Sequence, residues 1–366
     1  MKIPFINLSS QYKSLQSELD IAIQGVLERG RFILAEEVDA FEKEFAAYCG
    51  ADHAIGVASG TEALQLALSA SGVEMGDEVI TCAHTSVATV AAIELAGARP
   101  VLVDVDPSRY TLDPDLVSAS ITPRTRILLP VHIYGCPADL SRLLELANSR
   151  SLEVIEDCAQ AHGARVDGQH VGTFGRLGAF SFYPTKNLGA YGDGGAVITN
   201  DSALADYVRR LRQYGWGPDR VSSTRGFNSR LDELQAAILR VKLKHLAAWN
   251  SRRAEFADLY RSILSGCDVR LPPDPPDCEP VHHLFVIRCE KRDDLRAFLS
   301  KRGIQSLVHY PIPVHIQPAY ASLGYRAGSL PEAERLSREV LSLPLYPEMT
   351  DEMVGDVCQA VLDFFK

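Results

Sequence analysis

Short runs of apolar residues alternate with segments of helical periodicity between Ala54 and Thr199. Several of these runs are apolar throughout, which is typical of strands that are covered on both faces of a sheet. The strand-like runs cover residues 53–59, 77–82, 98–105, 126–134, 152–158, 178–183 and 195–200, and the clearest helical intervals cover 60–72, 86–97 and 138–150. Helical intervals between strands indicate right-handed crossovers into a mainly parallel sheet. The pattern therefore predicts a doubly wound α/β core.

The second half of the chain has a different pattern. Residues 231–264 keep apolar positions at helical spacing without Gly or Pro, which predicts a long connecting helix with at most one break. A Pro-rich loop follows at 266–280. Beyond it, strand-like and helix-like segments cover 282–289, 292–303, 304–310 and 351–365. We expect a large α/β domain over residues 1–250, with an N-terminal helical segment, and a small C-terminal α+β domain over residues 251–366.

Composition narrows the class of protein. With 366 residues, of which 46% are hydrophobic and 23% charged, the chain can bury a sizeable core. The net charge of -10 comes from scattered acidic residues, which gives no reason to expect nucleic acid or an anionic membrane as a partner. No apolar run reaches the ~20 residues of a membrane span, and the N-terminus lacks a signal-peptide pattern, so we expect a cytoplasmic protein.

The eight cysteines show no CxxC pair and no Cys/His spacing of a metal site. We therefore expect reduced, mostly buried thiols and no bound metal.

Candidate chemistry follows the strand-like runs, because ligands of doubly wound sheets bind at the carboxyl ends of the strands. Asp157 lies near the end of one run, with Gln160 three residues later, while Ser181 and Lys186 follow the next. A carboxylate, an amide, a hydroxyl and an amine at adjacent strand ends match the needs of pyridoxal phosphate. The alternative for Asp157 is a helix cap or a solvent-exposed acid.

Lys186 would ordinarily be a surface residue, because lysine is rarely buried. Here it follows a strand-like run and Pro184 and leads into the glycine-rich segment 189–195, whose backbone can approach a ligand closely. A desolvated lysine has a lowered pKa and becomes a nucleophile near neutral pH. The glycines match neither a dinucleotide fingerprint nor a Walker P-loop.

An anion site is expected where Gly60 and Thr61 join a strand to an amphipathic helix, because the free amides and dipole of a helix N-terminus favour a phosphate. Ser59 or Thr61 acting only as an N-cap explains the same local sequence equally well.

The ordered motifs SGTEAL, HTSVATVAAIELAGARPVLVDVD, VIEDCAQAHGA, FSFYPTKNLGAYGDGGAVIT and GFNSRLDELQAAIL resemble those of the DegT/StrS-type nucleotide-sugar aminotransferases, over nearly the whole chain. The resemblance implies a pyridoxal phosphate enzyme of fold type I, the aspartate aminotransferase fold. Its large domain has a mainly parallel sheet of seven strands between helices. It also implies a homodimer with a shared active site.

The resemblance also implies roles for the site residues. Lys186 would bind the cofactor as a Schiff base and move a proton, Asp157 would keep the ring nitrogen protonated, and Gln160 would lie near the ring hydroxyl. The cofactor phosphate would be bound by Gly60, Thr61 and Ser181 of one chain and by Asn228 of a second subunit.

One position departs from the family pattern. Many relatives carry an aromatic residue that stacks on the cofactor ring where this chain has Ser86, and a serine cannot stack. His84 is a candidate substitute, and Thr85 pointing inward is another. A hydrogen-bonded loop histidine is the alternative for His84.

Candidate substrate residues lie near the cofactor loop and in the C-terminal segment. Tyr183, His309, Tyr310 and His315 offer aromatic faces and imidazoles suited to a sugar, and Arg230 offers a guanidinium suited to a diphosphate. The alternative for each of the aromatic and imidazole side chains is that it only packs in the core or in a loop.

The expected reaction transfers the amino group of L-glutamate to the cofactor, releases 2-oxoglutarate, and then aminates a nucleotide-linked sugar from the pyridoxamine phosphate form. The residues of these motifs resemble those of the subgroup that acts on 3-keto-6-deoxyhexoses, with dTDP as the nucleotide. Alternatives are a 4-keto sugar or keto-inositol aminotransferase and a deoxygenating dehydratase, whose relatives often replace the lysine by histidine. A non-enzymatic regulator is a further alternative, which the intact site residues disfavour.

Overall fold

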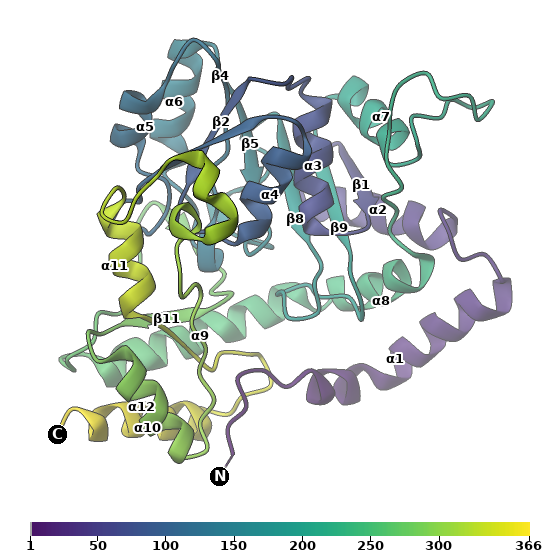
Figure 1. Ribbon diagram of the computed structural model, residues 1–366. Helices are drawn as coiled ribbons and strands as arrows, with labels where there is room; N and C mark the ends of the chain where they lie inside the picture. The colour runs from purple at the N-terminus through teal and green to yellow at the C-terminus, as the bar shows by residue number, and fades with distance from the viewer. Residues whose placement is uncertain (1) are drawn as a thin grey trace.

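The computed structural model describes residues 2–366, and its centre is a seven-stranded sheet between layers of helices (Figure 1). The strand order is β1-β9-β8-β5-β4-β2-β3. The strands are β1 (His53–Val57), β2 (Glu78–Cys82), β3 (Arg99–Val103), β4 (Thr125–Leu128), β5 (Glu153–Asp157), β8 (Leu177–Ser181) and β9 (Gly195–Thr199). Only β9 pairs antiparallel with its neighbours, β1 and β8, while the other pairings are parallel. The expected mainly parallel α/β core is confirmed.

Helices cover both faces of the sheet because alternate strand residues point to opposite sides. In β8, Ala179 packs into the core formed with α3 and α7, and Phe180 into the core formed with α2 and α8. The helices of this part of the chain are α2 (Glu36–Cys49), α3 (Gly60–Ala70), α4 (Val87–Leu95), α5 (Pro114–Ser120), α6 (Leu140–Arg150) and α7 (Ser202–Leu211).

The long connecting segment forms two helices, α8 (Glu233–Leu243) and α9 (Leu246–Leu264), with the single expected break at residues 244–245. The N-terminal helix α1 (Leu8–Arg29) runs beside α8 (Figure 1).

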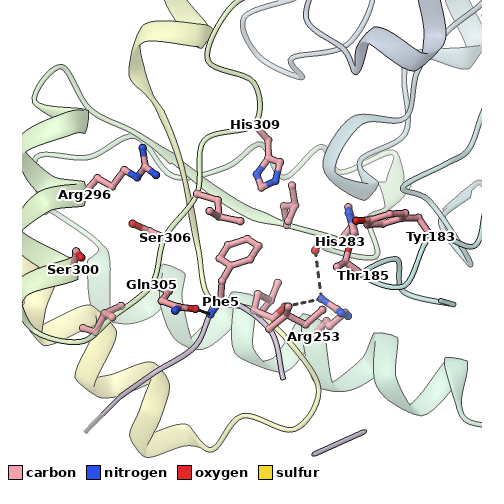
Figure 2. Close-up of a pocket in the computed structure, with 15 residues that line it drawn as sticks. Phe5, Tyr183, Thr185, Arg253, His283, Arg296, Ser300, Gln305, Ser306 and His309 are labelled. Atoms are coloured by element: carbon pink, nitrogen blue, oxygen red, sulfur yellow. Dashed lines mark hydrogen bonds between the residues drawn. The ribbon is translucent and has the colours of Figure 1, made fainter. Parts of the chain in front are cut away.

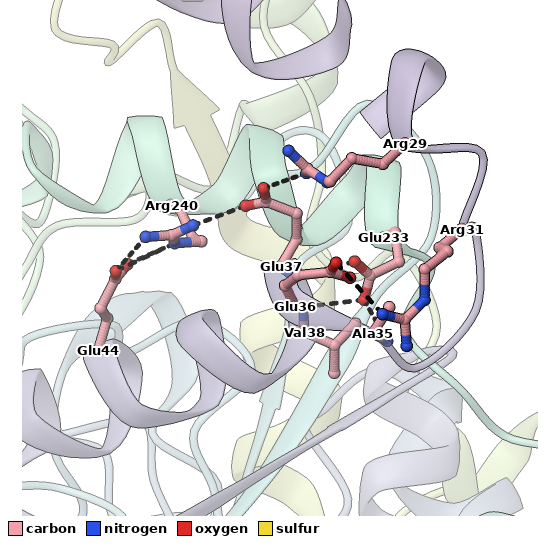
Figure 3. Close-up of polar contacts among 9 residues, drawn as sticks. All are labelled: Arg29, Arg31, Ala35, Glu36, Glu37, Val38, Glu44, Glu233 and Arg240. Carbon is pink, nitrogen blue, oxygen red and sulfur yellow. Dashed lines mark hydrogen bonds and ion pairs between the residues drawn. The ribbon is translucent and has the colours of Figure 1, made fainter. Parts of the chain in front are cut away.

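Two charged residues of α8 fix the start of α2 (Figure 3). The Glu233 carboxylate accepts hydrogen bonds from the backbone amides of Ala35, Glu37 and Val38 at 2.7, 2.9 and 3.0 Å, so it caps α2 from another helix. Arg240 pairs with two carboxylates of α2 at 2.7 Å each. The helix layer under the sheet is therefore held by charge-assisted contacts as well as by apolar packing.

The C-terminal part of the chain builds a second core around a two-stranded antiparallel sheet. Tyr260 of α9 stacks on Phe285 of this sheet with ring centres 4.7 Å apart. Its elements are β11 (Phe285–Arg288), β12 (Val340–Leu343), α10 (Arg292–Lys301), α11 (Pro331–Glu339) and α12 (Asp351–Phe364).

The N-terminal segment contributes Ile3 to this second core. Ile3 is buried in it and bridges to Ile304. This apolar residue thus has a bridge partner some 300 residues later in the chain.

Shorter elements connect the two cores. Residues of 314–333 pack against Ala83, Val90 and Leu102 of the large domain. The remaining elements are β6 (Arg165–Val166), β7 (Gln169–His170), β10 (Cys278–Glu279), η1 (Ile133–Gly135), η2 (Val314–Ile316) and η3 (Pro318–Leu323). Strand β10 pairs with β6, so the loop after α9 is tied to the large domain.

Between residues 2 and 366, none of the helices combines the length and the apolarity needed to cross a membrane. All eight cysteines are free thiols, and six of them are buried, as expected for small hydrophobic residues.

Candidate active site

A cavity of about 270 Å³ opens at the carboxyl ends of β5 and β8, beside the start of α3. It collects residues from five segments that are far apart in the sequence, within 59–64, 85–89, 131, 157–160 and 181–193. Among its lining residues are the predicted Gly60, Thr61, Ser86, Asp157, Gln160, Ser181, Tyr183 and Lys186.

Asp157 is the last residue of β5, and its side chain is buried. The Thr89 hydroxyl donates to one carboxylate oxygen at 2.9 Å, and the Ala159 amide donates to the other at 3.1 Å. Burial raises the pKa of Asp157, while these hydrogen bonds and the charge of Lys186 act in the opposite direction. The carboxylate is thus held in one orientation, in surroundings where a cationic partner would be strongly favoured.

Lys186 lies in the turn that follows β8, with its side chain half-buried. Its backbone amide donates to the Tyr183 carbonyl at 2.9 Å, which closes the turn. Loss of hydration lowers the pKa of Lys186 to about 8, against the opposing charge of Asp157. A substantial fraction of the amine is therefore neutral near physiological pH, as a Schiff-base nucleophile requires.

The start of α3 forms an anion-binding cradle with Ser181. Ser59 serves as the N-cap, because its hydroxyl accepts from the Glu62 amide at 3.2 Å, and Gly60 and Thr61 line the cavity. A Cβ at Gly60 would lie 2.4 Å from the Cβ of Ser181, so only glycine allows this approach. Free amides of a first helical turn beside a serine hydroxyl suit a phosphate group.

Gln160 links the cavity to the C-terminal part of the chain. Its amide oxygen accepts from the Tyr134 backbone at 2.6 Å, and its nitrogen donates to the Tyr310 hydroxyl at 3.1 Å. Both ends of the amide are engaged, so its orientation is fixed, and Tyr310 contacts a residue that lines the cavity without lining it itself.

The structure places His84 behind the cavity wall. Its Nε2 lies 2.6 Å from the Tyr134 hydroxyl, and burial lowers the pKa of His84 to about 3, so the ring is neutral. The hydrogen-bonded alternative therefore describes its position better than stacking. Ser86 caps α4 and lines the cavity together with Thr85, so hydroxyl groups lie at the position where the resemblance implies an aromatic ring.

A second cavity, of about 590 Å³, shares Tyr183 with the first and lies between the two parts of the chain (Figure 2). His309 lines it, and its Nδ1 contacts the Ser342 hydroxyl at 2.8 Å. Burial lowers the pKa of His309 to about 4. Polar and basic side chains around it include Thr185, Arg253, His283, Arg296, Ser300, Gln305 and Ser306.

Besides His84 and Tyr310, three predicted residues line neither cavity within one chain. His315 is buried and contacts the Glu334 carboxylate at 3.1 Å, so the structure places it in a core pair away from the site. Arg230 lies over the ring of Tyr214, with 5.9 Å between its guanidinium carbon and the ring centre. Asn228 is exposed.

Sequence reasoning missed two contributors. Thr89 lies in the first turn of α4 and Thr85 directly precedes its N-cap Ser86, and their hydroxyls are 2.9 Å apart. Two threonines four residues apart at the start of a helix beside the predicted strand ends are a signal that could have identified the pair. Tyr134 has a positive φ of 60° and contacts both His84 and Gln160, and nothing in its local sequence indicates this conformation.

His132, Glu156 and Cys158 gather in a buried cluster with the composition of a metal site. Glu156 accepts hydrogen bonds from His132 at 3.1 Å and from three backbone amides of residues 172–175. The other ring nitrogen of His132 accepts from the Ala138 amide at 3.0 Å. These bonds satisfy the two polar side chains and account for the cluster without an ion.

Comparison with known proteins identifies the family. Residues 13–362 match the DegT/DnrJ/EryC1/StrS aminotransferase family. The chain is 51% identical over 364 residues to the dTDP-3-amino-3,4,6-trideoxy-alpha-D-glucose transaminase of Streptomyces venezuelae, covering 99% of this chain and 96% of that protein. It is 50% identical over 358 residues to the erythromycin biosynthesis sensory transduction protein EryC1 of Saccharopolyspora erythraea, covering 98% of each.

A solved structure agrees with these relatives. The crystal structure of S. venezuelae DesV in complex with a ketimine intermediate superposes with a TM-score of 0.98 at 51% identity, covering 100% of this chain and 99% of that chain. The fold and the resemblance inferred from the motifs are confirmed. The chain belongs to the DegT/DnrJ/EryC1/StrS aminotransferase family.

Proposed function

We propose that the protein is a pyridoxal phosphate-dependent aminotransferase that moves the amino group of L-glutamate to a nucleotide-linked 3-keto-6-deoxyhexose, with dTDP as the nucleotide. The observation that carries the proposal is the convergence of Asp157, Lys186 and the start of α3 on one cavity. The transaminase of S. venezuelae, which is 51% identical, supports the choice of sugar and nucleotide.

The residues present fit the cofactor. Asp157 would pair with the ring nitrogen, Lys186 would bind the cofactor covalently, and Gly60, Thr61 and Ser181 would hold the phosphate. When bound, pyridoxal phosphate supplies an electron sink next to the reacting carbon of the substrate. The crowding at Gly60 and the orphan amides of α3 are the features of this chain that favour the phosphate position.

Proton transfer falls to Lys186. With its pKa lowered to about 8, its amine can accept the proton from the amine-bearing carbon of the substrate near neutral pH, and it would deliver that proton to the cofactor carbon that takes over the amino nitrogen. Asp157 would favour a protonated ring nitrogen through its fixed carboxylate, and the bound cofactor would then draw electrons from the reacting carbon.

The second cavity would receive the nucleotide part of the acceptor. It shares Tyr183 with the first cavity, so a long substrate can extend from the reacting carbon into it. Arg253 and Arg296 line it, and none of the described residues that line it is acidic. A positive lining without carboxylates suits a diphosphate.

A second copy of the chain would complete the site. Asn228 is exposed and Arg230 half-buried on the loop between α7 and α8, and neither reaches the cavities of its own chain. We propose that the homodimer places Asn228 at the cofactor phosphate of the partner and Arg230 near the substrate.

The experiment that tests the proposal follows the visible absorption of the purified protein with pyridoxal phosphate, before and after adding glutamate. We expect the band of the lysine-bound cofactor to disappear while 2-oxoglutarate is released in equal amount. A band that persists with glutamate would reject glutamate as donor, and no band at all would reject the role of Lys186.

The acceptor is identified with the enzyme in its pyridoxamine phosphate form. Separate samples receive a dTDP-linked 3-keto sugar, a dTDP-linked 4-keto sugar or a keto-inositol. We expect the 3-keto sugar to restore the original absorption fastest. Because the relative EryC1 carries the name of a sensory transduction protein, a promoter-fragment gel shift at physiological salt serves as the test of a regulatory role. Sequence-specific binding there would favour the regulator.

A further inference from the structure

A second lysine lies behind the loop that carries Lys186. Lys242 belongs to α8, and its side chain has 0% exposure. Its ammonium donates to the Gly189 carbonyl at 2.7 Å and lies 4.0 Å from the ring centre of Tyr191. It lines neither of the two cavities. Lys242 therefore contacts Gly189 and Tyr191, which lie three and five positions after Lys186 in the same loop.

The same face of α8 holds this loop at a second point. Gln235, two helical turns before Lys242, accepts from the Tyr191 backbone amide at 2.8 Å. The two α8 side chains therefore contact the loop through Gly189 and Tyr191.

The loop is closely folded where these contacts are made. A Cβ at Gly189 would lie 2.3 Å from the Pro184 carbonyl oxygen. The backbone at Gly189 therefore packs directly against the backbone at Pro184, and Lys186 lies in the turn between them. The Ala190 amide donates to the Phe182 carbonyl at 2.8 Å. Because the turn is closed at its base, a displacement of Gly189 would be passed to Lys186.

Burying an ammonium is costly, and an apolar residue of similar volume would pack without that cost. Burial lowers the pKa of Lys242 to about 7, and the charge of nearby Glu348 acts against this shift. Glu348 itself has a raised pKa, mainly because of burial, and one of its carboxylate oxygens is buried without a hydrogen-bond partner. Because an apolar residue would fill this space at lower cost, the presence of a lysine here indicates a role other than packing.

We propose that Lys242 is a positioning residue that holds segment 189–191 against α8 and thereby keeps the amine of Lys186 directed into the cofactor cavity. The inference rests on the function proposed for Lys186, and it adds a residue outside the cavity to the machinery that orients it.

The test compares Lys242→Met, which keeps the volume and removes the charge, with Lys242→Arg, which keeps a donor and the charge. Lys244→Met is the matched control, because Lys244 is the exposed C-cap residue of α8, two positions after Lys242. Hydrogen–deuterium exchange of the peptide covering 186–195 is measured on cofactor-free protein. The single-turnover rate with glutamate is measured on protein loaded with pyridoxal phosphate.

For Lys242→Met we expect faster exchange in this peptide and a rate of the glutamate half-reaction that is about 10- to 100-fold lower, with little change in the glutamate concentration for half-maximal rate. Lys242→Arg should recover part of the rate, and Lys244→Met should match the parent protein in both measurements.

Parental exchange and parental rate in Lys242→Met would overturn the proposal. A lowered melting temperature with both readouts unchanged would also overturn it, because that is the result of a purely structural role. If the methionine variant does not fold, Lys242→Gln replaces it, and the same outcomes apply. A parent protein that does not react with glutamate would reject the proposed function, while the exchange comparison would still test the contact.

Discussion

The hydroxyl of Thr89 donates a 2.9 Å hydrogen bond to the Asp157 carboxylate. Because this donation uses the only hydrogen of Thr89, its 2.9 Å contact with Thr85 must have Thr85 as the donor. The two threonines thus form a short relay from α4 to the end of β5. The relay stabilises the ionised form of a buried carboxyl group that would pair with the ring nitrogen of the cofactor.

Thr89→Val should therefore weaken cofactor function without disturbing the packing. Removing a hydrogen bond to a charged group raises the pKa of Asp157 further, and we expect about a tenfold loss in pyridoxal phosphate affinity or in the glutamate half-reaction rate. Titration of absorbance and single-turnover kinetics measure the two quantities. Thr85→Val should have a smaller effect, since Thr89 keeps its bond to Asp157, and equal effects of the two variants would contradict the relay.

Replacement of Lys186 should separate cofactor binding from chemistry. Lys186→Ala is expected to abolish transamination while some cofactor stays bound through the phosphate contacts of α3 and Ser181. Equilibrium dialysis with pyridoxal phosphate and an assay for 2-oxoglutarate check the two parts. Transamination at the parental rate would show that another residue carries the chemistry.

Acylation of Lys186 by an amine-directed reagent should depend on pH in cofactor-free protein. Only the neutral amine reacts, and the pKa of about 8 predicts that its labelling rises steeply through this pH rather than near the ordinary lysine value of about 10.4. Asp157→Asn should move the midpoint to lower pH, because the Asp157 charge raises the pKa of Lys186. Mass spectrometry of the labelled peptide gives the midpoint, and a shift to higher pH would be inconsistent with this pairing.

Gly60→Ala tests the cradle at the start of α3. The added Cβ would lie 2.4 Å from the Cβ of Ser181, so the helix start or the serine must move. We expect about a tenfold weaker affinity for pyridoxal phosphate, because the clash displaces the groups that would bind its phosphate. Gly355→Ala is the control, since a Cβ there meets nothing within 4 Å. Equal affinities for the two variants would place the phosphate elsewhere.

Glu233→Ala should lower stability through the helix it caps (Figure 3). Three buried or half-buried amides at the start of α2 would lose their acceptor, which we expect to cost about 2 kcal/mol of the free energy of unfolding. Denaturant titration measures this loss. Glu36→Ala, in the same turn but exposed and paired only with exposed Arg31, should change stability by less than about 0.5 kcal/mol.

The sequence by itself determined that Asp157, Ser181 and Lys186 lie close together. Asp157 and Ser181 end two neighbouring parallel strands, and Lys186 follows the second. Because the carboxyl ends of parallel strands meet at one edge of a sheet, the local pattern predicted that these residues are close in space. The break between α8 and α9 and the capped start of α3 were equally local. These features depend on residues within a few positions of one another, so the local sequence is enough to predict them.

Only the tertiary structure decided which partner each side chain meets across long stretches of chain. Strand β9 has the apolar pattern of its neighbours, and its antiparallel direction follows from a connection after β8 that contains no helix to cross over. His315 meets Glu334 and His84 meets Tyr134 because of how separate segments pack. A histidine in a loop has the same local sequence whether it faces a cavity or a buried carboxylate. Lys242 likewise reveals its contact with Gly189 only when α8 lies against the loop, because burial and hydrogen bonding are properties of the packed chain.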